Sequence, residues 1–395
     1  MSTFQHRRIA RAGRHWRSRP GGLPAAAVAV ATSLLAALGA CGSADSGSSV
    51  PASSGGGTDS AVIAKAREAV QLAERRPTEL SLQAPINRPV PTGKRVVWMG
   101  SGQSVSVLQA KIVEETAKAL GWTSSTIPVD GTPQSMKAAF GQILRDKPDV
   151  VLYAATPKSA FLPELKQAAD AGIFVAAVST TDRPGDGLQF VIATDQDNGV
   201  RAQTFVDWTI SKLDGSGTVL YVGLPSYAIL QSAFAEFSGR LAKECPACRI
   251  QTVDVPLTAI GVGSTDMIVS ALRAHPEIKN VIVASDPLAV GLPAALKAAG
   301  ITGVNLVGAS PDPTTLQQIV SGQQSGSIMT PYYEAIYGMM DAAVRSETGL
   351  PFNAEGGLPR WWLLDKDNIP TTKDLFPVVE DVKSQYYRLW GVPGA

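Results

Sequence analysis

Short apolar runs recur along the chain from about residue 94 onward and predict strands of buried sheets. Most intervals between them are about 22 to 31 residues long and contain apolar positions at helical spacing. Alternation of strands and helices predicts parallel sheets with helices on both faces. Ten strands are too many for the sheet of one small lobe, so we expect an α/β fold of two doubly wound parallel-sheet lobes. The predicted strands begin near Arg95, Thr126, Asp149, Phe174, Phe190, Thr218, Arg249, Val281, Asn305 and Ser327.

A polar residue followed by proline comes directly after four of these strands. Threonine and aspartate cap free N–H groups of helices, and proline suits the first helical position. These pairs therefore predict the edge where strands end and helices begin, which is the ligand-binding edge of open α/β sheets. They are Thr156-Pro157, Asp286-Pro287, Asp312-Pro313 and Thr330-Pro331. Pro163 and Pro293 come later, inside helical patterns, where they either shift the helix start or kink the helix.

The first forty residues have the layout of a secretory signal. They contain six arginines and no acidic residue, and an apolar run extends from Leu23 to Leu38. This run is short for a membrane span. Leu38-Gly39-Ala40-Cys41 resembles a bacterial lipobox, in which Cys41 is lipidated and becomes the mature N-terminus. An ordinary signal with a chance cysteine is the alternative.

A flexible tether is predicted at 41–60, because its nineteen residues after Cys41 include five glycines and seven serines. Residues 61–93 then form an N-terminal element, a short helix from Ala61 to Arg75 followed by a proline-punctuated connector. No later segment is apolar and long enough to span a membrane.

Charge and histidine content exclude several function classes. The net charge is +1, but the chain after residue 40 holds 29 basic and 34 acidic residues, which argues against nucleic-acid binding. Only His275 remains after the signal, in a helix-to-strand turn away from the ligand edge. A catalytic triad or a histidine metal site is therefore not expected. No nucleotide-binding loop is present either, so we predict no catalytic residue, cofactor or metal.

Cys245 and Cys248 form the one Cys-x-x-Cys pair of the chain. A zinc site would need partners that the sequence lacks. A redox centre should open a helix after a strand, whereas this pair follows a helical pattern and precedes a strand. In an exported protein we expect a local structural disulfide.

The stretch from Lys94 to about Ile369 resembles the type I periplasmic solute-binding proteins, the ribose-binding-like group that feeds ABC importers. The resemblance rests on the order and spacing of several segments. They are Asp149–Tyr153, Ala171–Val175, Ala284–Gly291, Ala294–Gly300, Asn305–Ala309 and Trp362–Ile369.

The chain departs from this family where sugar hydroxyls are usually held. Ser179 and Thr180 stand in place of an aspartate–arginine pair, and Asp182-Arg183 follows three residues late. Ala233 stands where the second lobe usually offers an arginine. A site short of such donors predicts a solute less polar than a simple sugar, or an aromatic one.

Candidate ligand residues follow the predicted strands. Asp286 could accept hydrogen bonds from ligand hydroxyls, and capping the next helix is its alternative role. The loop Gly100–Ser104 could hold an oxygen-rich ligand through its N–H groups, with Gln103 and Ser104 as candidates, or could simply be a tight turn. Tyr227, Tyr332 and Tyr333 could stack on a flat ligand or pack between the lobes. The full set is Gln103, Ser104, Ser179, Thr180, Tyr227, Asp286 and Tyr332.

The resemblance implies two lobes, three hinge crossings and closure on a small solute, sugar or sugar-like. By the family pattern, 94–195 with 331–359 form the first lobe, and 196–330 with 360–395 form the second. The implied protein is a monomeric lipoprotein on the outer face of the cell membrane, with an ABC permease as partner. A ligand-sensing lipoprotein that signals to a membrane receptor is the first alternative, and an enzyme on the same lobes is the second.

Overall fold

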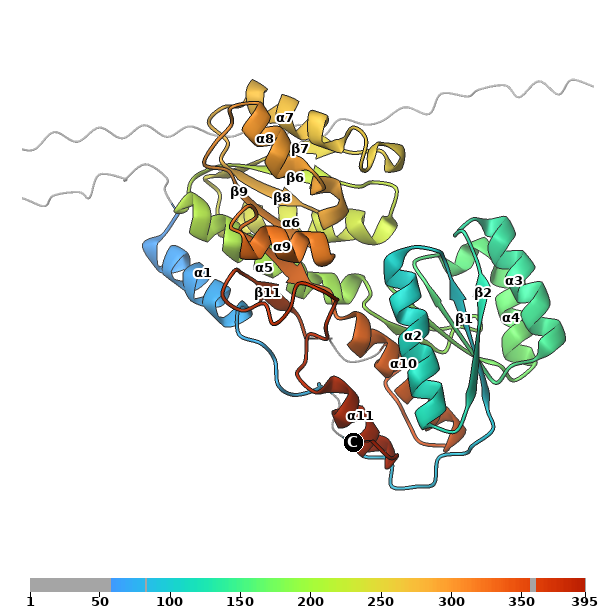
Figure 1. The fold of residues 1–395 in the computed structure, drawn as a ribbon. Coiled ribbons are helices and arrows are strands. Elements are labelled where there is room, and N and C mark those ends of the chain that lie inside the picture. The colour runs from blue at the N-terminus through green and yellow to red at the C-terminus, as the bar shows by residue number, and fades with distance from the viewer. Residues whose placement is uncertain (1–57, 82–83, 356–359, 395) are drawn as a thin grey trace, which may run out of the picture. The chain divides into compact units, whose positions relative to one another are not determined.

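The computed structural model describes residues 58–81, 84–355 and 360–394 (Figure 1). Cys41, the predicted signal at 1–40 and most of the predicted tether lie outside the described residues. Within these ranges no helix is both long and apolar enough to cross a membrane.

The first lobe is built on a parallel five-stranded sheet. Its strands are β1 (Arg95–Gly100), β2 (Thr123–Pro128), β3 (Val150–Ala154), β4 (Phe174–Val178) and β5 (Phe190–Ile192), in the order β2-β1-β3-β4-β5. Successive side chains face opposite sides. Val96 and Trp98 join one core, whereas Val97 and Met99 join the other.

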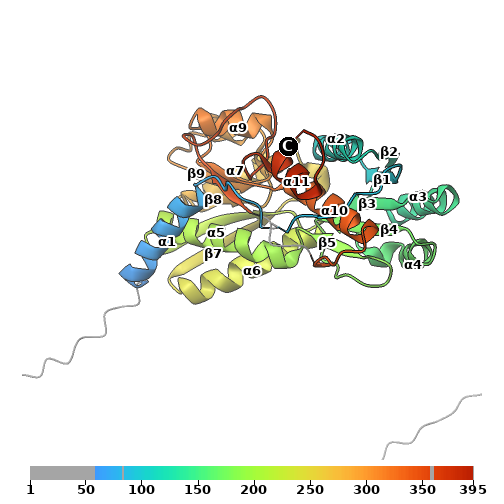
Figure 2. The same ribbon diagram turned by 90° about the horizontal axis from the view of Figure 1, so that it is seen from below.

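Helices cover both faces of this first sheet (Figure 2). The core of Trp98 also contains residues of α2 (Ser104–Ala119), α10 (Tyr332–Glu347) and α11 (Val382–Trp390). The core of Met99 contains residues of α3 (Pro133–Asp146) and α4 (Leu162–Asp170). Burial of both faces explains why the strands read as apolar runs.

The second lobe is built on a six-stranded sheet. Its strands are β6 (Gly217–Gly223), β7 (Cys248–Asp254), β8 (Asn280–Val283), β9 (Asn305–Ala309), β10 (Gly326–Met329) and β11 (Trp362–Leu364), in the order β11-β10-β9-β8-β6-β7. Only β11 runs antiparallel to its neighbour.

Helices α5 (Asp195–Leu213) and α6 (Ala228–Glu244) cover one face of the second sheet, and α7 (Ser264–Ala274) and α8 (Leu292–Ala298) cover the other (Figure 1). The short α9 (Pro313–Val320) packs on β10 and β11. Helix α1 (Ser60–Ala73) lies along α5, with Ala66 in the core of this lobe. The described residues also form the single-turn helices η1 (Lys158–Ala160), η2 (Leu257–Ala259) and η3 (Asp286–Ala289).

The prediction of two doubly wound parallel-sheet lobes is confirmed. Nine of the ten predicted strand starts lie within one residue of the observed ones. The exception is β2, which begins at Thr123 rather than near Thr126. It is an edge strand with a mostly exposed, polar first half, so its sequence carries no apolar signal there.

The expected placement of 360–395 in the second lobe needs a correction. Strand β11 does join the second sheet, but α11 packs in the core of the first lobe. Tyr386 of α11 stacks on Tyr337 of α10 with ring centroids 5.2 Å apart, and Trp390 lies 6.1 Å from the same ring. These aromatic contacts decide where the C-terminal helix lies, and no local pattern records them.

The connector, residues 74–94, runs from α1 on the second lobe to β1 of the first. Arg76 donates to the carbonyl oxygen of Pro377 at 3.0 Å and lies 5.1 Å from the ring centroid of Trp362. Farther along, the N–H of Ile86 donates to the carbonyl oxygen of Leu389 at 2.6 Å. The connector therefore adds a chain passage between the lobes, beside the expected ones.

The two prolines mark helix starts, whereas only one of the four predicted helix caps forms. Pro163 and Pro293 lie in the first turns of α4 and α8, so they mark helix starts and cause no kink. Of the four predicted caps, only Asp312 accepts a bond from a helix N–H, that of Thr315, at 2.8 Å. The side chains at the other three positions make different contacts or leave the helix end uncapped.

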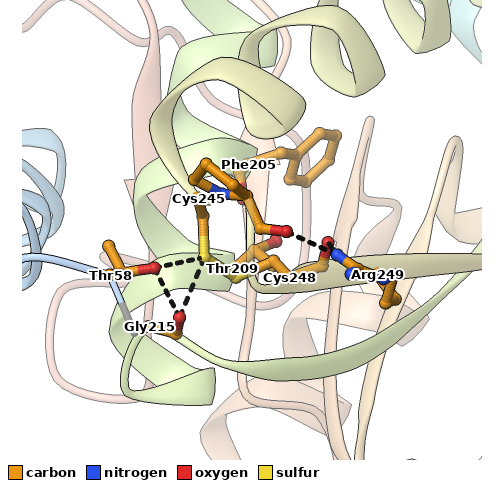
Figure 3. The surroundings of a disulfide bond; sticks show 8 residues. Thr58, Phe205, Thr209, Gly215, Cys245, Cys248 and Arg249 are labelled. Atoms are coloured by element: carbon orange, nitrogen blue, oxygen red, sulfur yellow. Dashed lines mark hydrogen bonds between the residues drawn. A yellow bond between two sulfur atoms is a disulfide. The ribbon is translucent and has the colours of Figure 1, made fainter. Parts of the chain in front are cut away.

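Cys245 and Cys248 form a disulfide between the end of α6 and the start of β7 (Figure 3). The hydroxyl of Thr58 donates to the carbonyl oxygen of Gly215 at 2.5 Å and lies 3.1 Å from the sulfur of Cys245. The disulfide therefore borders the point where the chain enters α1.

Candidate functional site

Half-buried hydroxyl side chains stand at the carboxyl ends of strands in both sheets. One follows β1, one follows β4, and three follow β8, β9 and β10. We call this set the hydroxyl rim: Ser101, Ser179, Ser285, Ser310 and Thr330. Because the carboxyl edge of a parallel sheet is where α/β proteins bind ligands, the rim is the candidate site.

Left-handed backbone conformations accompany this edge. Ala155, Ser179, Ala193 and Ser310 directly follow β3, β4, β5 and β9 with φ between 53° and 63°. Each costs about 1 kcal/mol or more in a residue with a Cβ, so the surrounding hydrogen bonds must hold it. The N–H of Ser179 donates to Ile192, for example, and that of Ser310 to Ile328. Strain of this kind is typical of functional sites.

Tyr332, one of the predicted site residues, lies beside the rim of the second lobe. The hydroxyl oxygens of Ser310 and Thr330 are 2.8 Å apart. Burial raises the pKa of Tyr332, and hydrogen bonds with these two hydroxyls counteract part of that rise in pKa. The three hydroxyl groups thus form one connected polar group at the ends of β9 and β10.

Arg201, which sequence reasoning missed, lies next to this group. It is only 5% exposed, and its Nη2 donates to the carbonyl oxygen of Ala284 at 3.1 Å. Its Nε has no hydrogen-bond partner among the described residues. Burial lowers the pKa of Arg201, whereas the nearby Tyr221 and Tyr332 counteract that shift. A buried arginine inside an amphipathic helix carries no sequence signal that separates it from an exposed one.

Asp286, the leading sequence candidate, is buried beneath the edge. It is 1% exposed, and its two oxygens accept hydrogen bonds from Gln324, at 2.7 Å, and from Ser327. A Cβ on Gly308 would lie 2.0 Å from its Oδ1, so β9 needs glycine there. Burial raises the pKa of Asp286 to about 7. This carboxyl group therefore braces β9 and β10, and neither of its oxygens is exposed for a solute.

Thr180 is also buried, and it organises the first-lobe edge. Its hydroxyl donates to Asp182 at 2.9 Å, and the same carboxylate oxygen accepts the N–H of Lys158 at 2.6 Å. Asp182 therefore links the loop after β4 to the loop after β3. Of the predicted pair at this place, Ser179 is part of the rim and Thr180 supports it.

Gln103 and Ser104 are exposed at the start of α2. Ser101 N–H donates to Ser106, and Gln103 N–H lies 3.4 Å from the hydroxyl of Ser101, so two N–H groups of the loop are already engaged. A Cβ on Gly100 would lie 2.4 Å from Trp98, which accounts for glycine there.

The two remaining tyrosines differ in position. Tyr227 is half-buried at the start of α6 and packs against the second-lobe core. Tyr333 donates to the carbonyl oxygen of Leu375 at 3.1 Å and packs against the first-lobe core. Ala233 is buried inside α6. Among the described side chains, no group of three or more His, Cys, Asp or Glu is arranged to hold a metal ion.

A family model described as the periplasmic binding protein domain matches residues 96–350. Comparison with curated proteins gives no match.

Several solved structures share the fold. A solute-binding protein from Actinobacillus succinogenes 130z with bound D-allose is 16% identical, with a TM-score of 0.60 over 69% of this chain and 98% of its own. One from Agrobacterium vitis with bound allitol is 19% identical, with a TM-score of 0.59 over 70% of this chain and 96% of its own. One from Burkholderia graminis C4D1M in complex with D-arabinose is 17% identical, with a TM-score of 0.59 over 72% of this chain and 99% of its own.

Proposed function

The chain belongs to the periplasmic binding protein family, and from that premise we propose that it captures a small hydroxyl-bearing solute between its two lobes outside the cytoplasm. The hydroxyl rim carries the proposal. Its five side chains are half-buried and follow strands of both sheets, so solute contacts with both lobes would favour the closed state over the open one. Catalysis is not required.

The chemistry of the rim favours a neutral solute. Serine and threonine hydroxyls both donate and accept hydrogen bonds, which matches the hydroxyl groups of a sugar or polyol. Of the charged groups nearby, Asp286 and Arg201 are buried beneath the edge, and one oxygen of half-buried Asp182 is engaged by Thr180 and Lys158. Similar structures with bound D-allose, allitol and D-arabinose support a sugar or polyol as the first choice.

A solute less polar than a simple sugar is the second candidate. The observation in its favour is that Asp286 has both oxygens engaged by Gln324 and Ser327. With Asp286 buried and one oxygen of Asp182 already engaged, this edge offers fewer strong acceptors than a site with the usual aspartate–arginine pair.

Delivery and anchoring form the second part of the proposal. We propose that Cys41 carries a lipid, that the tether at 41–60 holds the monomer near the outer face of the membrane, and that an ABC permease receives the solute. Detergent phase partitioning of the exported protein, with a Cys41→Ala variant for comparison, tests the anchor. A variant that stays in the detergent phase would contradict lipidation at this residue.

The solute is tested by thermal unfolding of the exported protein with D-allose, allitol, D-arabinose, methylated sugars, nucleosides and aromatic acids. A solute at about 1,000 times its Kd adds roughly 4 kcal/mol to the stability of the folded state. We expect a selective shift for one class. A Ser310→Ala, Thr330→Val double variant should lose that shift, whereas Ser238→Ala, a half-buried serine on α6 outside the rim, should keep it. Equal shifts in both variants would place the site elsewhere.

A further inference from the structure

A cavity of about 450 Å³ lies beside α10 and shares no lining residue with the hydroxyl rim, although Ile192 of its lining accepts the N–H of Ser179. Its walls come from β5, α10, the connector, the segment after α10, and α11 with Val379 just before it. The lining is mostly apolar, and its charged residues are Glu334, Asp341, Arg345 and the exposed Arg360. We call it the connector cavity and define its floor by Ile192, Glu334, Gly338, Ala342, Val379 and Tyr386.

The apolar walls are held by packing inside the first lobe. A Cβ on Gly338 would lie 2.8 Å from Ile192, so α10 and β5 approach closely at the floor. Tyr386 is fixed by its stacking on Tyr337. Phe352 packs edge-on against Phe190, with ring centroids 6.3 Å apart. This volume is within the range of small-molecule sites.

Glu334 places an unpartnered oxygen in this floor. The residue is 4% exposed, and its Oε1 accepts the N–H of Val379 at 2.7 Å. Its Oε2 is buried without a partner among the described residues. A buried acceptor without a partner is expensive. Arg76 is near enough to lower the pKa of Glu334, but its guanidinium donates to the carbonyl oxygens of Pro377 and Val378.

The other acidic group of the cavity is fully paired. Asp341 accepts from Nε of Arg345 at 2.7 Å through one oxygen and from the indole of Trp390 at 2.9 Å through the other. Arg345 in turn donates to the carbonyl oxygen of Ala84 in the connector at 2.5 Å. Of the two buried carboxyl groups, therefore, only Glu334 has an oxygen that still lacks a partner.

We propose that the connector cavity is a second binding site, for a small aromatic or aliphatic amine whose ammonium group pairs with Glu334. The hydrocarbon part would occupy the apolar space between Ile192, Phe352 and Tyr386. An ammonium group supplies both the missing hydrogen bond and a cation in direct contact with Oε2, whereas a neutral alcohol supplies only the hydrogen bond. Aromatic walls also attract a cation.

Occupancy would affect the link between the lobes. The cavity is bordered by the connector at Ser81 and Ala84 and by the chain passage at Pro351 and Asn353. A ligand there contacts two segments that lead from one lobe to the other.

The test is calorimetric titration of the exported protein with benzylamine and with benzyl alcohol, which has the same shape. Burial raises the pKa of Glu334 to about 7, so titration at pH 8 keeps most of this group ionised. We expect benzylamine to bind at least about tenfold more tightly than the alcohol. Glu334→Gln should remove that difference, because the amide keeps the shape and loses the charge.

Two further variants complete the test. Glu347→Gln, on the same helix but outside the cavity and paired with Lys94, should leave benzylamine binding unchanged. Ala84→Trp, at the exposed mouth, should block both probes without disturbing the floor. Equal affinity for the amine and the alcohol, unchanged affinity in Glu334→Gln, or no detectable heat with benzylamine would each overturn the proposal.

Discussion

Arg201 donates a hydrogen bond from Nη2 to the carbonyl oxygen of Ala284, and this contact joins α5 to the end of β8. The two residues lie 83 positions apart. Helix α5 comes directly after β5, so it begins where the chain passes from the first lobe to the second. The contact therefore connects this chain passage to the strand end at which Ser285 of the rim lies. Tyr332, at the return passage, lies close enough to affect the pKa of the same guanidinium.

Arg201→Leu should lower solute affinity at least about tenfold while changing the free energy of unfolding by no more than about 2 kcal/mol. The leucine removes a buried cation, which is itself costly, so the loss of the hydrogen bond is partly offset. The edge nevertheless loses the hydrogen bond to Ala284, which lies next to Ser285 of the rim, and the cation near Tyr332. Titration with the solute found in the panel, together with urea unfolding, measures both effects. Arg240→Leu, an exposed residue of α6, is the control, and equal affinity in the two variants would exclude this role.

Ionisation of buried Asp286 should lower the free energy of unfolding as pH rises from about 4 to about 7. Its pKa is raised from 3.8 in the unfolded chain to about 7 in the folded one, so the folded state binds more protons in this window. The loss of unfolding free energy caused by this pKa difference reaches its full value, about 4 kcal/mol, above pH 7. Asp286→Asn should flatten this part of the profile. Urea unfolding at pH 5 and pH 8 checks it, and an unchanged pH dependence in the variant would contradict the assignment.

Arg76→Ala should lower the free energy of unfolding by about 2 kcal/mol, because the charged side chain donates to the carbonyl oxygens of Pro377 and Val378 and covers Trp362. Arg67→Ala is the matched control. Its ion pair with Asp214 is exposed, so about 0.5 kcal/mol or less is expected. Chemical denaturation measures both, and similar losses would mean that the connector is not a stabilising link.

Replacing both Cys245 and Cys248 by alanine should cost only about 2 kcal/mol, since the disulfide closes a loop with a sequence separation of 3. Alkylation followed by mass spectrometry of the exported protein should find no free thiol. Two free thiols in the air-exposed protein would show that the pair is reduced in solution, whatever the stability of the variant.

The sequence by itself determined the layered α/β fold and almost every strand start. Apolar periodicity is a local property, and strands buried on both faces, such as β3 and β4, display it without interruption. The Cys-x-x-Cys pair could also be interpreted locally, because its place between α6 and β7 follows from the same pattern.

Only the tertiary structure decided which polar groups lie at the candidate site. Asp286 follows β8 as a ligand contact would, but its oxygens accept from Gln324 and Ser327, about forty residues away. The sequence did not single out Arg201 as a site residue. The pattern of a helix shows its amphipathic face, but it does not show which strand end that face contacts in the fold. The same reason places α11 in the first lobe, since Tyr386 and Trp390 contact Tyr337 only after both helices have packed. Burial of polar side chains depends on contacts distant in sequence, and local patterns do not encode those contacts.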